Sequence, residues 1–168
     1  MNLIEYHREN NKLTEDAKSK LKSVIEKHNT IIILGNGGSS SISSHISQDY
    51  TKKLKKKAFT FSDPSRLTCY ANDYGYEQAY VEFLKESSKG EESLLVVLIS
   101  SSGNSENIIR SAYWCKQNNI PLVILSGFKK DNLLKEGFED YSSISFWVDS
   151  SDYGVVECVH QSFLHMAV

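Results

Sequence analysis

The stretch Thr30-Ile-Ile-Ile-Leu-Gly-Asn-Gly-Gly-Ser-Ser-Ser-Ile-Ser-Ser-His-Ile-Ser-Gln-Asp-Tyr50 decides the fold. Its opening run, Ile31 to Leu34, is apolar and rich in β-branched residues, which is typical of a buried parallel strand. Three of the next four residues are glycines, which permit positive φ angles and a close approach of backbone N–H groups to a ligand. Ser39 to Ser41 follow as candidate N-caps of a helix that we expect to reach about Lys53.

A strand, a glycine turn and a helix N-terminus form a geometry that holds an anion, because free N–H groups and the helix dipole point into the turn. The pattern does not fit a dinucleotide site. Ser40 stands where G-x-G-x-x-G has its third glycine, and the basic run Lys52 to Lys57 replaces the expected acidic residue. The Gly-Lys-Ser/Thr of a P-loop is also missing. The turn is therefore either a nest for one phosphate or a tight turn that needs glycine only for packing.

The length, composition and charge of the whole chain narrow the possible classes of protein further. Its 168 residues suit one domain, 1–168, and a hydrophobic content of 40% with 24% charged residues is ordinary for a globular protein. A net charge of -2 predicts no general attraction to nucleic acid or to an acidic membrane. No apolar run approaches the ~20 residues that span a bilayer, and the N-terminus shows no signal-peptide pattern. The odd set Cys69, Cys115 and Cys158 has no C-x-x-C, which predicts reduced, buried thiols in a cytoplasmic protein.

Helical and strand patterns alternate along the rest of the chain. Residues 1–12 are polar, and we expect them to be flexible or loosely docked. The expected elements are a helix capped by Thr14 to about His28, a strand at 58–61, a turn at 63–65, a polar and aromatic loop around 73–76, a helix at 76–87, a strand at 93–99, a helix through Ile108 to Cys115, a strand at 121–125, a short helix near 132–135, a strand at 143–148 and a last helix capped by Ser151 or Asp152. This alternation predicts an α/β fold, a three-layer doubly wound sandwich with a central parallel sheet of about five strands.

A second anion nest follows the most apolar strand. Ser100, Ser101, Ser102 and Ser105 surround Gly103 at the start of the next helix. Hydroxyls and a glycine at a helix N-terminus can donate to several oxygens of one phosphate without a cation. Two such turns at the carboxyl ends of strands can frame one crevice, which strengthens the ligand interpretation.

Two residues of the helix after the first nest, His45 and Asp49, are four apart and so lie on one face. The spacing suits two metal ligands, an acid and a base in one cavity, or a simple surface contact. The basic run beyond them is interpreted as a solvated helix end, from which one lysine can still reach a phosphate.

Four motifs together resemble the sugar isomerase (SIS) domain, and within it the phosphoheptose isomerase (sedoheptulose 7-phosphate isomerase) family. They are Gly35-Asn36-Gly37-Gly38-Ser39 with a histidine six residues on, the run Leu67 to Tyr76, the run Ile99 to Asn107, and the helix with Glu157, His160 and His165. The resemblance covers about residues 20–168. It implies a flavodoxin-like SIS fold and a homotetramer with sites at subunit interfaces. It also implies conversion of sedoheptulose 7-phosphate to D-glycero-D-manno-heptose 7-phosphate for lipopolysaccharide or other surface glycans.

The resemblance assigns roles to particular residues. It implies phosphate binding by Ser100, Ser101, Ser102 and Ser105, and sugar binding by Asn36, Gly37, Gly38, Ser39, Asn72 and Asp73. It implies that Lys53 takes the place of a pocket arginine, and that the acid/base and zinc-ligand positions fall on His45, Asp49, Glu157 and His165. Two of these depart from the family: Asp49 replaces a glutamate and Glu157 replaces a glutamine.

An aldose–ketose exchange moves a proton between C1 and C2 through an enediol, which needs a base and an acid. We expect Asp49 and His165 to be that catalytic pair. Zinc held by His45, Asp49, Glu157 and His165 would instead polarise the sugar oxygens, and these two roles compete. His160 is interpreted as a structural histidine. The alternatives are a non-catalytic SIS module that binds a sugar phosphate or a protein partner, and an isomerase of another sugar phosphate.

Overall fold

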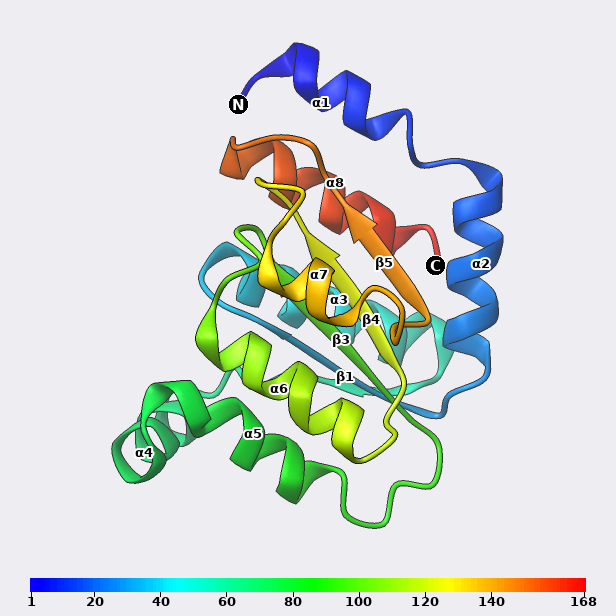
Figure 1. Cartoon of the computed structure of the whole chain (residues 1–168). Coiled ribbons are helices and arrows are strands. Elements are labelled where there is room, and N and C mark those ends of the chain that lie inside the picture. The colour runs from blue at the N-terminus through cyan, green and yellow to red at the C-terminus, as the bar shows by residue number, and fades with distance from the viewer.

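A five-stranded, all-parallel sheet forms the centre of the molecule in the computed structural model, which describes all residues 1–168 (Figure 1). The strands are β1 (Thr30–Gly35), β2 (Lys57–Phe59), β3 (Leu94–Ser100), β4 (Leu122–Ser126) and β5 (Ile144–Trp147). Their spatial order is β2-β1-β3-β4-β5, and every pair is parallel. The expected three-layer α/β fold with a flavodoxin-like sheet is confirmed.

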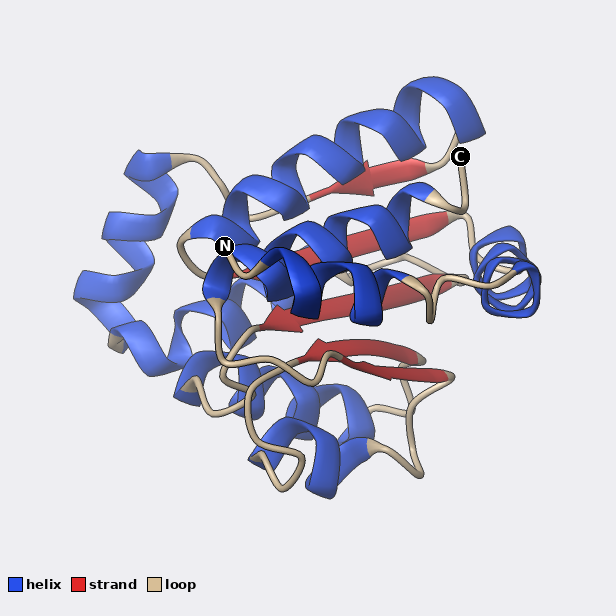
Figure 2. Cartoon of the chain, turned by 90° about the horizontal axis from the view of Figure 1, so that it is seen from above, coloured by secondary structure: helices blue, strands red, loops and turns tan.

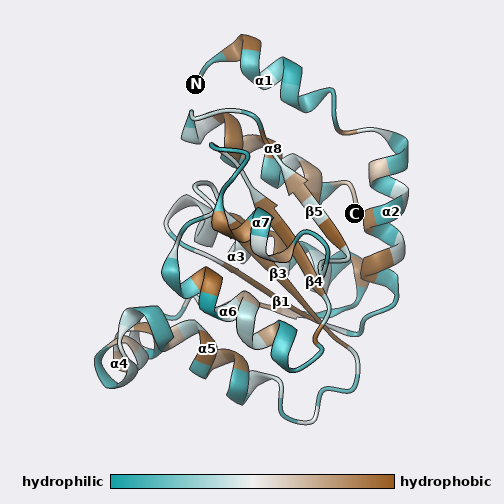
Figure 3. Cartoon of the chain, in the orientation of Figure 1, coloured by the Kyte–Doolittle hydropathy of each residue, from teal (hydrophilic) through white to brown (hydrophobic).

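Helices cover both faces of the sheet, as the view from above shows (Figure 2). They are α1 (Leu3–Asn10), α2 (Glu15–Glu26), α3 (Gly38–Leu54), α4 (Pro64–Tyr74), α5 (Tyr76–Ser87), α6 (Glu106–Gln117), α7 (Leu133–Phe138) and α8 (Tyr153–His165). One core packs α5, α6 and α7 against one face of the strands, and the other packs α2, α3 and α8 against the opposite face. The strands are apolar on both faces because both are buried, so they form the brown centre of Figure 3.

The sheet reverses its direction of growth between β1 and β3. These strands are neighbours, with Gly35 paired to Ile99, yet α3 follows β1 on one face of the sheet and α6 follows β3 on the other. The two connections therefore diverge at the carboxyl ends of β1 and β3. In open parallel sheets this switch point is where a crevice for a ligand forms.

Two local expectations were wrong. Residues 63–76 do not form a turn and a loop, because Pro64 to Tyr74 is helix α4. Asp63 is its N-cap and accepts a hydrogen bond from the Arg66 N–H, and proline at the first helical position needs no N–H partner. Helix α3 starts at Gly38 with Gly37 as its N-cap, so Ser39 to Ser41 lie inside the helix and do not cap it.

The N-terminal segment also differs from the expectation of a flexible or loosely docked tail. Residues Leu3 to Asn10 form α1, which lies across α8 at the top of Figure 1. Glu9 on this helix is buried, and the Nζ of Lys12 stands 5.2 Å from the ring centroid of Trp147 at the end of β5. The expectation is therefore corrected: α1 is seated on the body of the domain.

The cysteines are all free, but only Cys115 is buried, while Cys69 and Cys158 are exposed. The expectation of three buried thiols was wrong for these two. None of the helices has the length and apolar character that crossing a bilayer would require.

Candidate active site

A cavity of about 230 Å³ lies at the switch point between β1 and β3. It is lined by Asn36, Gly37, Gly38, Ser39, Ile99, Ser100, Ser101, Ser102, Ser105, Tyr153 and Glu157. The structure thus brings both predicted anion nests together at one cavity. No lysine, arginine or histidine is among the lining residues, so an anion there meets hydroxyls and the N-terminal ends of α3 and α6.

The serine loop after β3 is arranged to leave hydroxyls available. The Ser101 Oγ is buried and has no hydrogen-bond partner. Ser105 is the N-cap of α6, yet its side chain makes no capping hydrogen bond and lies 3.3 Å from the Ser100 Oγ. A buried polar group normally has a partner, so the Ser101 hydroxyl is left for a ligand, and the Ser105 hydroxyl, which accepts from Ser100, still has its proton to donate. Gly103 holds the loop with a φ of 66°, and a Cβ there would meet Asn132 at 1.9 Å.

Asn36 is held in a fixed orientation beside this loop. Its Nδ2 donates to the Asn107 Oδ1 at 2.9 Å, and the Asn107 Nδ2 donates back to the Asn36 Oδ1 at 2.9 Å. The Tyr76 hydroxyl donates to the same Asn36 Oδ1 at 2.9 Å. Sequence reasoning did not assign roles to Asn107 and Tyr76. Asn107 stands in the motif after Gly103, and its polar side chain on the inner side of α6 was the available signal.

Glu157 enters the same cavity from α8. Its carboxylate lies against Gly38, since a Cβ added to Gly38 would meet the Glu157 Oε1 at 2.4 Å. The first turn of α3 has no side-chain cap, so this carboxylate sits near the positive end of the α3 dipole. Tyr153, one turn earlier on α8, also lines the cavity and was not predicted as a site residue.

A second group of candidate residues lies further along α3, at the end of α8. The Asp49 Oδ2 is 3.7 Å from the His45 Nε2, 3.5 Å from the His165 Nδ1 and 3.6 Å from the Lys53 Nζ. Tyr50 joins the two helices here, because its buried hydroxyl donates to the Leu164 carbonyl at 2.9 Å. Burial lowers the pKa of His165, and the nearby His45 lowers it further, while Asp49 acts in the opposite direction.

The donor set of this group fits a zinc ion. His45, Asp49 and His165 offer ligand atoms that all lie within 4.8 Å of one another. Imidazole nitrogens and a carboxylate oxygen are ligands that zinc accepts. The Lys53 ammonium lies beside the same carboxylate, where a metal cation would replace it.

Glu157 does not join this group within one chain. It is two helical turns from His165, ~12 Å along α8 at 1.5 Å per residue. The distance along α3 from Gly38 to Asp49 is roughly 16 Å by the same measure. One chain therefore carries the anion cavity and the His–Asp group as two separate clusters.

Asn72 and Asp73 are also apart from the cavity. They lie on α4, which has no buried residue and stands off from the sheet at the lower left of Figure 1. The Asn72 Nδ2 donates to the Asp73 Oδ1 at 3.0 Å, and neither residue lines the cavity. His160 faces the core, where its Nε2 donates to the Ser126 carbonyl at 3.0 Å, in agreement with a structural role.

Comparisons with known proteins agree with this geometry. The family model described as SIS domain matches residues 2–127. The phosphoheptose isomerase of Fusobacterium nucleatum subsp. nucleatum is 32% identical over 165 residues, 95% of this chain and 81% of that protein. The phosphoheptose isomerase of Cytophaga hutchinsonii is 32% identical over 138 residues, 79% of this chain and 71% of that protein.

Among solved structures, the phosphoheptose isomerase of Neisseria gonorrhoeae superposes with a TM-score of 0.84. The superposition covers 98% of this chain and 90% of that one at 21% identity, so it supports the fold. Sequence similarity, family model and fold agree with one another. The chain belongs to the SIS-domain family and, within it, to the phosphoheptose isomerases.

Proposed function

We propose that this protein isomerises sedoheptulose 7-phosphate to D-glycero-D-manno-heptose 7-phosphate, in heptose synthesis for lipopolysaccharide or other surface glycans. The observation that carries the proposal is the Asp49 carboxylate, which lies between two imidazoles contributed by two helices. Its relatives named phosphoheptose isomerase support the choice of substrate.

The phosphate of the substrate is held by the hydroxyls of Ser100, Ser101, Ser102 and Ser105. The N-terminal ends of α3 and α6 add favourable electrostatics without a cation. Asn36, Gly37, Gly38 and Ser39 meet the first sugar hydroxyls, and Asn36 can do so without reorganisation because Asn107 and Tyr76 fix its amide.

The proton transfer falls to Asp49 and His165. The Asp49 carboxylate takes a proton from C1 of the ketose while the C2 oxygen gains a proton from His165, which gives the enediol. The O1 proton then returns to His165 and the carboxylic acid returns its proton to C2, so C1 becomes the aldehyde and both side chains are restored.

We further propose that zinc binds His45, Asp49 and His165. Bound there, the ion would polarise the oxygens at C1 and C2. An Asp49 that is a zinc ligand is a weaker base, so the acid/base role and the metal role compete at this residue. The Lys53 ammonium beside Asp49 supplies a positive charge when no metal is bound.

The separation of the two clusters leads us to propose a homo-oligomer, a tetramer, with sites at subunit interfaces. A seven-carbon sugar phosphate with single bonds of about 1.5 Å reaches about 10 Å when extended, which is less than the roughly 16 Å from Gly38 to Asp49 along α3. A neighbouring copy can bring its His–Asp group to the cavity. The Glu157 carboxylate of the first chain then becomes the fourth ligand of the zinc ion held by the neighbour's His–Asp group. Helix α4 of a neighbour can bring Asn72 and Asp73 to the same cavity.

We also propose a cytoplasmic location. The three free thiols support a reducing compartment, where cysteines stay unpaired.

The second candidate is a non-catalytic SIS module that binds a sugar phosphate or a protein partner. The Lys53–Asp49 ion pair favours it, because the ammonium occupies the carboxylate that an isomerase needs free for the substrate. Such a module would keep the phosphate cavity and show no turnover.

Deuterium exchange distinguishes the two. Enediol formation in heavy water replaces a carbon-bound hydrogen of the substrate, which mass spectrometry detects. We expect exchange with sedoheptulose 7-phosphate and a loss of at least ~100-fold for Asp49→Asn. Asp140→Asn is the matched control, because Asp140 is exposed and far from both clusters in sequence. Phosphate binding without exchange in the wild type would establish the binding module instead.

A further inference from the structure

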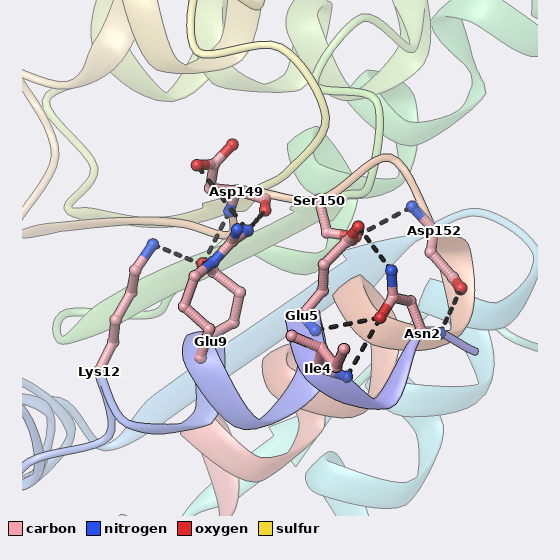
Figure 4. Close-up of polar contacts among 9 residues, drawn as sticks. Asn2, Ile4, Glu5, Glu9, Lys12, Asp149, Ser150 and Asp152 are labelled. Atoms are coloured by element: carbon pink, nitrogen blue, oxygen red, sulfur yellow. Dashed lines mark hydrogen bonds and ion pairs between the residues drawn. The ribbon is translucent and has the colours of Figure 1, made fainter.

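Glu9 is a buried carboxylate outside the proposed site. Only 1% of its surface is exposed, and it has three donors: the Asp149 N–H at 2.8 Å, the Lys12 Nζ at 2.5 Å and the Arg8 Nε at 2.9 Å (Figure 4). Burial alone raises the pKa of Glu9, but the hydrogen bonds from Lys12, Asp149 and Arg8 outweigh it and the pKa is lowered. A charge this well covered is costly to leave unpaired, so its partners are held firmly in place.

The partners of α1 concentrate on one short turn, residues 149–152, between β5 and α8. Besides the Glu9 contact, the Arg8 guanidinium donates to the Asp149 carbonyl, and the Ser150 Oγ donates to the Glu5 Oε2 at 2.5 Å. The backbone N–H of Asn2 donates to the Asp152 Oδ2 at 2.8 Å. Figure 4 shows these contacts along one side of α1.

This turn sets the start of α8. The Asp152 Oδ1 accepts from the Gly154 N–H at 2.8 Å and from the Val155 N–H at 3.3 Å, which caps the helix. The next residue, Tyr153, lines the cavity, and Glu157 follows one turn later. A displacement of the turn would therefore move both cavity residues of α8.

We propose that Glu9 is a positioning residue for the phosphate cavity: it fixes the 149–152 turn and, through that turn, keeps Tyr153 in the cavity wall and the Glu157 carboxylate against Gly38. The role rests on the proposed function only for the identity of the ligand. Glu9→Gln tests this role, because the NH₂ group of glutamine would face N–H donors from which the carboxylate accepts hydrogen bonds.

The test measures the affinity for inorganic phosphate by calorimetry, with backbone hydrogen exchange and thermal unfolding on the same samples. We expect Glu9→Gln to weaken phosphate binding about tenfold and to speed exchange in residues 149–158, while exchange in β1 and β3 is unchanged. Glu15→Gln is the matched control, because Glu15 is exposed and pairs only with Lys18. Ser150→Ala, which removes the hydroxyl that donates to Glu5 and accepts from the Asp152 N–H, should give the same local pattern.

A uniform loss of stability with unchanged phosphate affinity would overturn the proposal, because α1 would then be a structural brace alone. A wild type that binds no phosphate would overturn it as well. Since neither readout needs turnover, a protein that binds phosphate but exchanges no deuterium would contradict the proposed isomerase and leave the role of Glu9 supported. If Glu9→Gln does not fold, Lys12→Met, which removes one of the three donors to Glu9, decides the question by the same measurements.

Discussion

Ser101 has a hydroxyl that is buried at the cavity wall with no partner. A hydroxyl taken out of water without a hydrogen bond costs about 1–3 kcal/mol in proteins. That cost is recovered only when an acceptor arrives, which makes Ser101 the residue at which folding and ligand binding oppose each other.

Ser101→Ala should therefore weaken phosphate binding without lowering stability. One hydrogen bond to a charged group contributes about 1.5–3 kcal/mol, so we expect a loss of about 10- to 100-fold in affinity. Titration calorimetry and chemical unfolding measure the two effects. Ser145→Ala is the matched control, because the Ser145 Oγ is also buried and unpartnered but lies on β5 outside the cavity. Equal phosphate affinity of the Ser101 variant and the control would contradict the assigned role.

His160 contributes to the loss of stability in acid. Burial lowers its pKa to about 4, although the hydrogen bond to the Ser126 carbonyl acts in the opposite direction. Between the ordinary pKa of 6.5 and this value, the unfolded chain binds a proton that the folded chain refuses. The free energy of unfolding should therefore fall by about 3 kcal/mol as the pH drops from 6.5 to 4.

Urea unfolding at a series of pH values checks this. His160→Gln keeps a donor for the Ser126 carbonyl but cannot titrate, so its stability should lose most of the slope between pH 6.5 and 4. An unchanged slope would mean that other groups cause the acid sensitivity.

At the scale of elements, the pairing of α3 with α8 decides the geometry of the His–Asp group. The Tyr50 hydroxyl donates to the Leu164 carbonyl next to His165, and its pKa is raised by burial. This hydrogen bond fixes the end of α8 against α3. Tyr50 is adjacent in sequence to Asp49, and Leu164 is adjacent to His165.

Tyr50→Phe should cost about 1 kcal/mol of stability, the usual contribution of one hydrogen bond. It should lower exchange activity by more than this stability loss explains, because His165 loses its support. Tyr141→Phe is the control, since the Tyr141 hydroxyl donates to the Ile120 carbonyl at 2.8 Å away from both clusters. Equal activity in the two variants would show that α8 keeps its place without Tyr50.

Most elements could be predicted from the sequence, because apolar runs such as Leu94 to Ile99 and helical spacing are local signals. Helix α4 was missed because Asp63-Pro64 serves a turn and a helix start equally well. The packing of α1 on the domain was missed because its polar residues contact a turn about 140 residues away, and no local sequence pattern indicates such contacts.

The candidate site was partly predictable for the same reason. The serine and glycine nests lie at strand ends, and the parallel sheet brings those ends to one cavity. The separation of Glu157 from His165 could also have been predicted, because eight residues of one helix span ~12 Å. The approach of Asp49 to His165 does not follow from spacing, because it depends on how α3 packs against α8.

At the scale of the whole molecule, the anion cavity and the His–Asp group of one chain lie too far apart to act on one substrate molecule. We therefore expect that a chain with a defective cavity and a chain with a defective His–Asp group complement each other in a mixed oligomer. Asp49→Asn and Ser101→Ala chains, unfolded together and refolded as a mixture, should regain activity. Random pairing of two kinds of chain restores about one site in four. Enzyme assays of the mixture and of each variant alone measure the gain. A mixture as inactive as its components would place the complete site within one chain.

The contact of Lys12 with the Trp147 ring allows the position of α1 to be followed by tryptophan fluorescence. The chain has only two tryptophans, and the other, Trp114, lies on α6. With Trp114 replaced by phenylalanine, all indole emission would come from a ring beneath the Lys12 ammonium. The wavelength and intensity of the Trp147 emission would then report the detachment of α1 from the domain as it happens, in unlabelled protein.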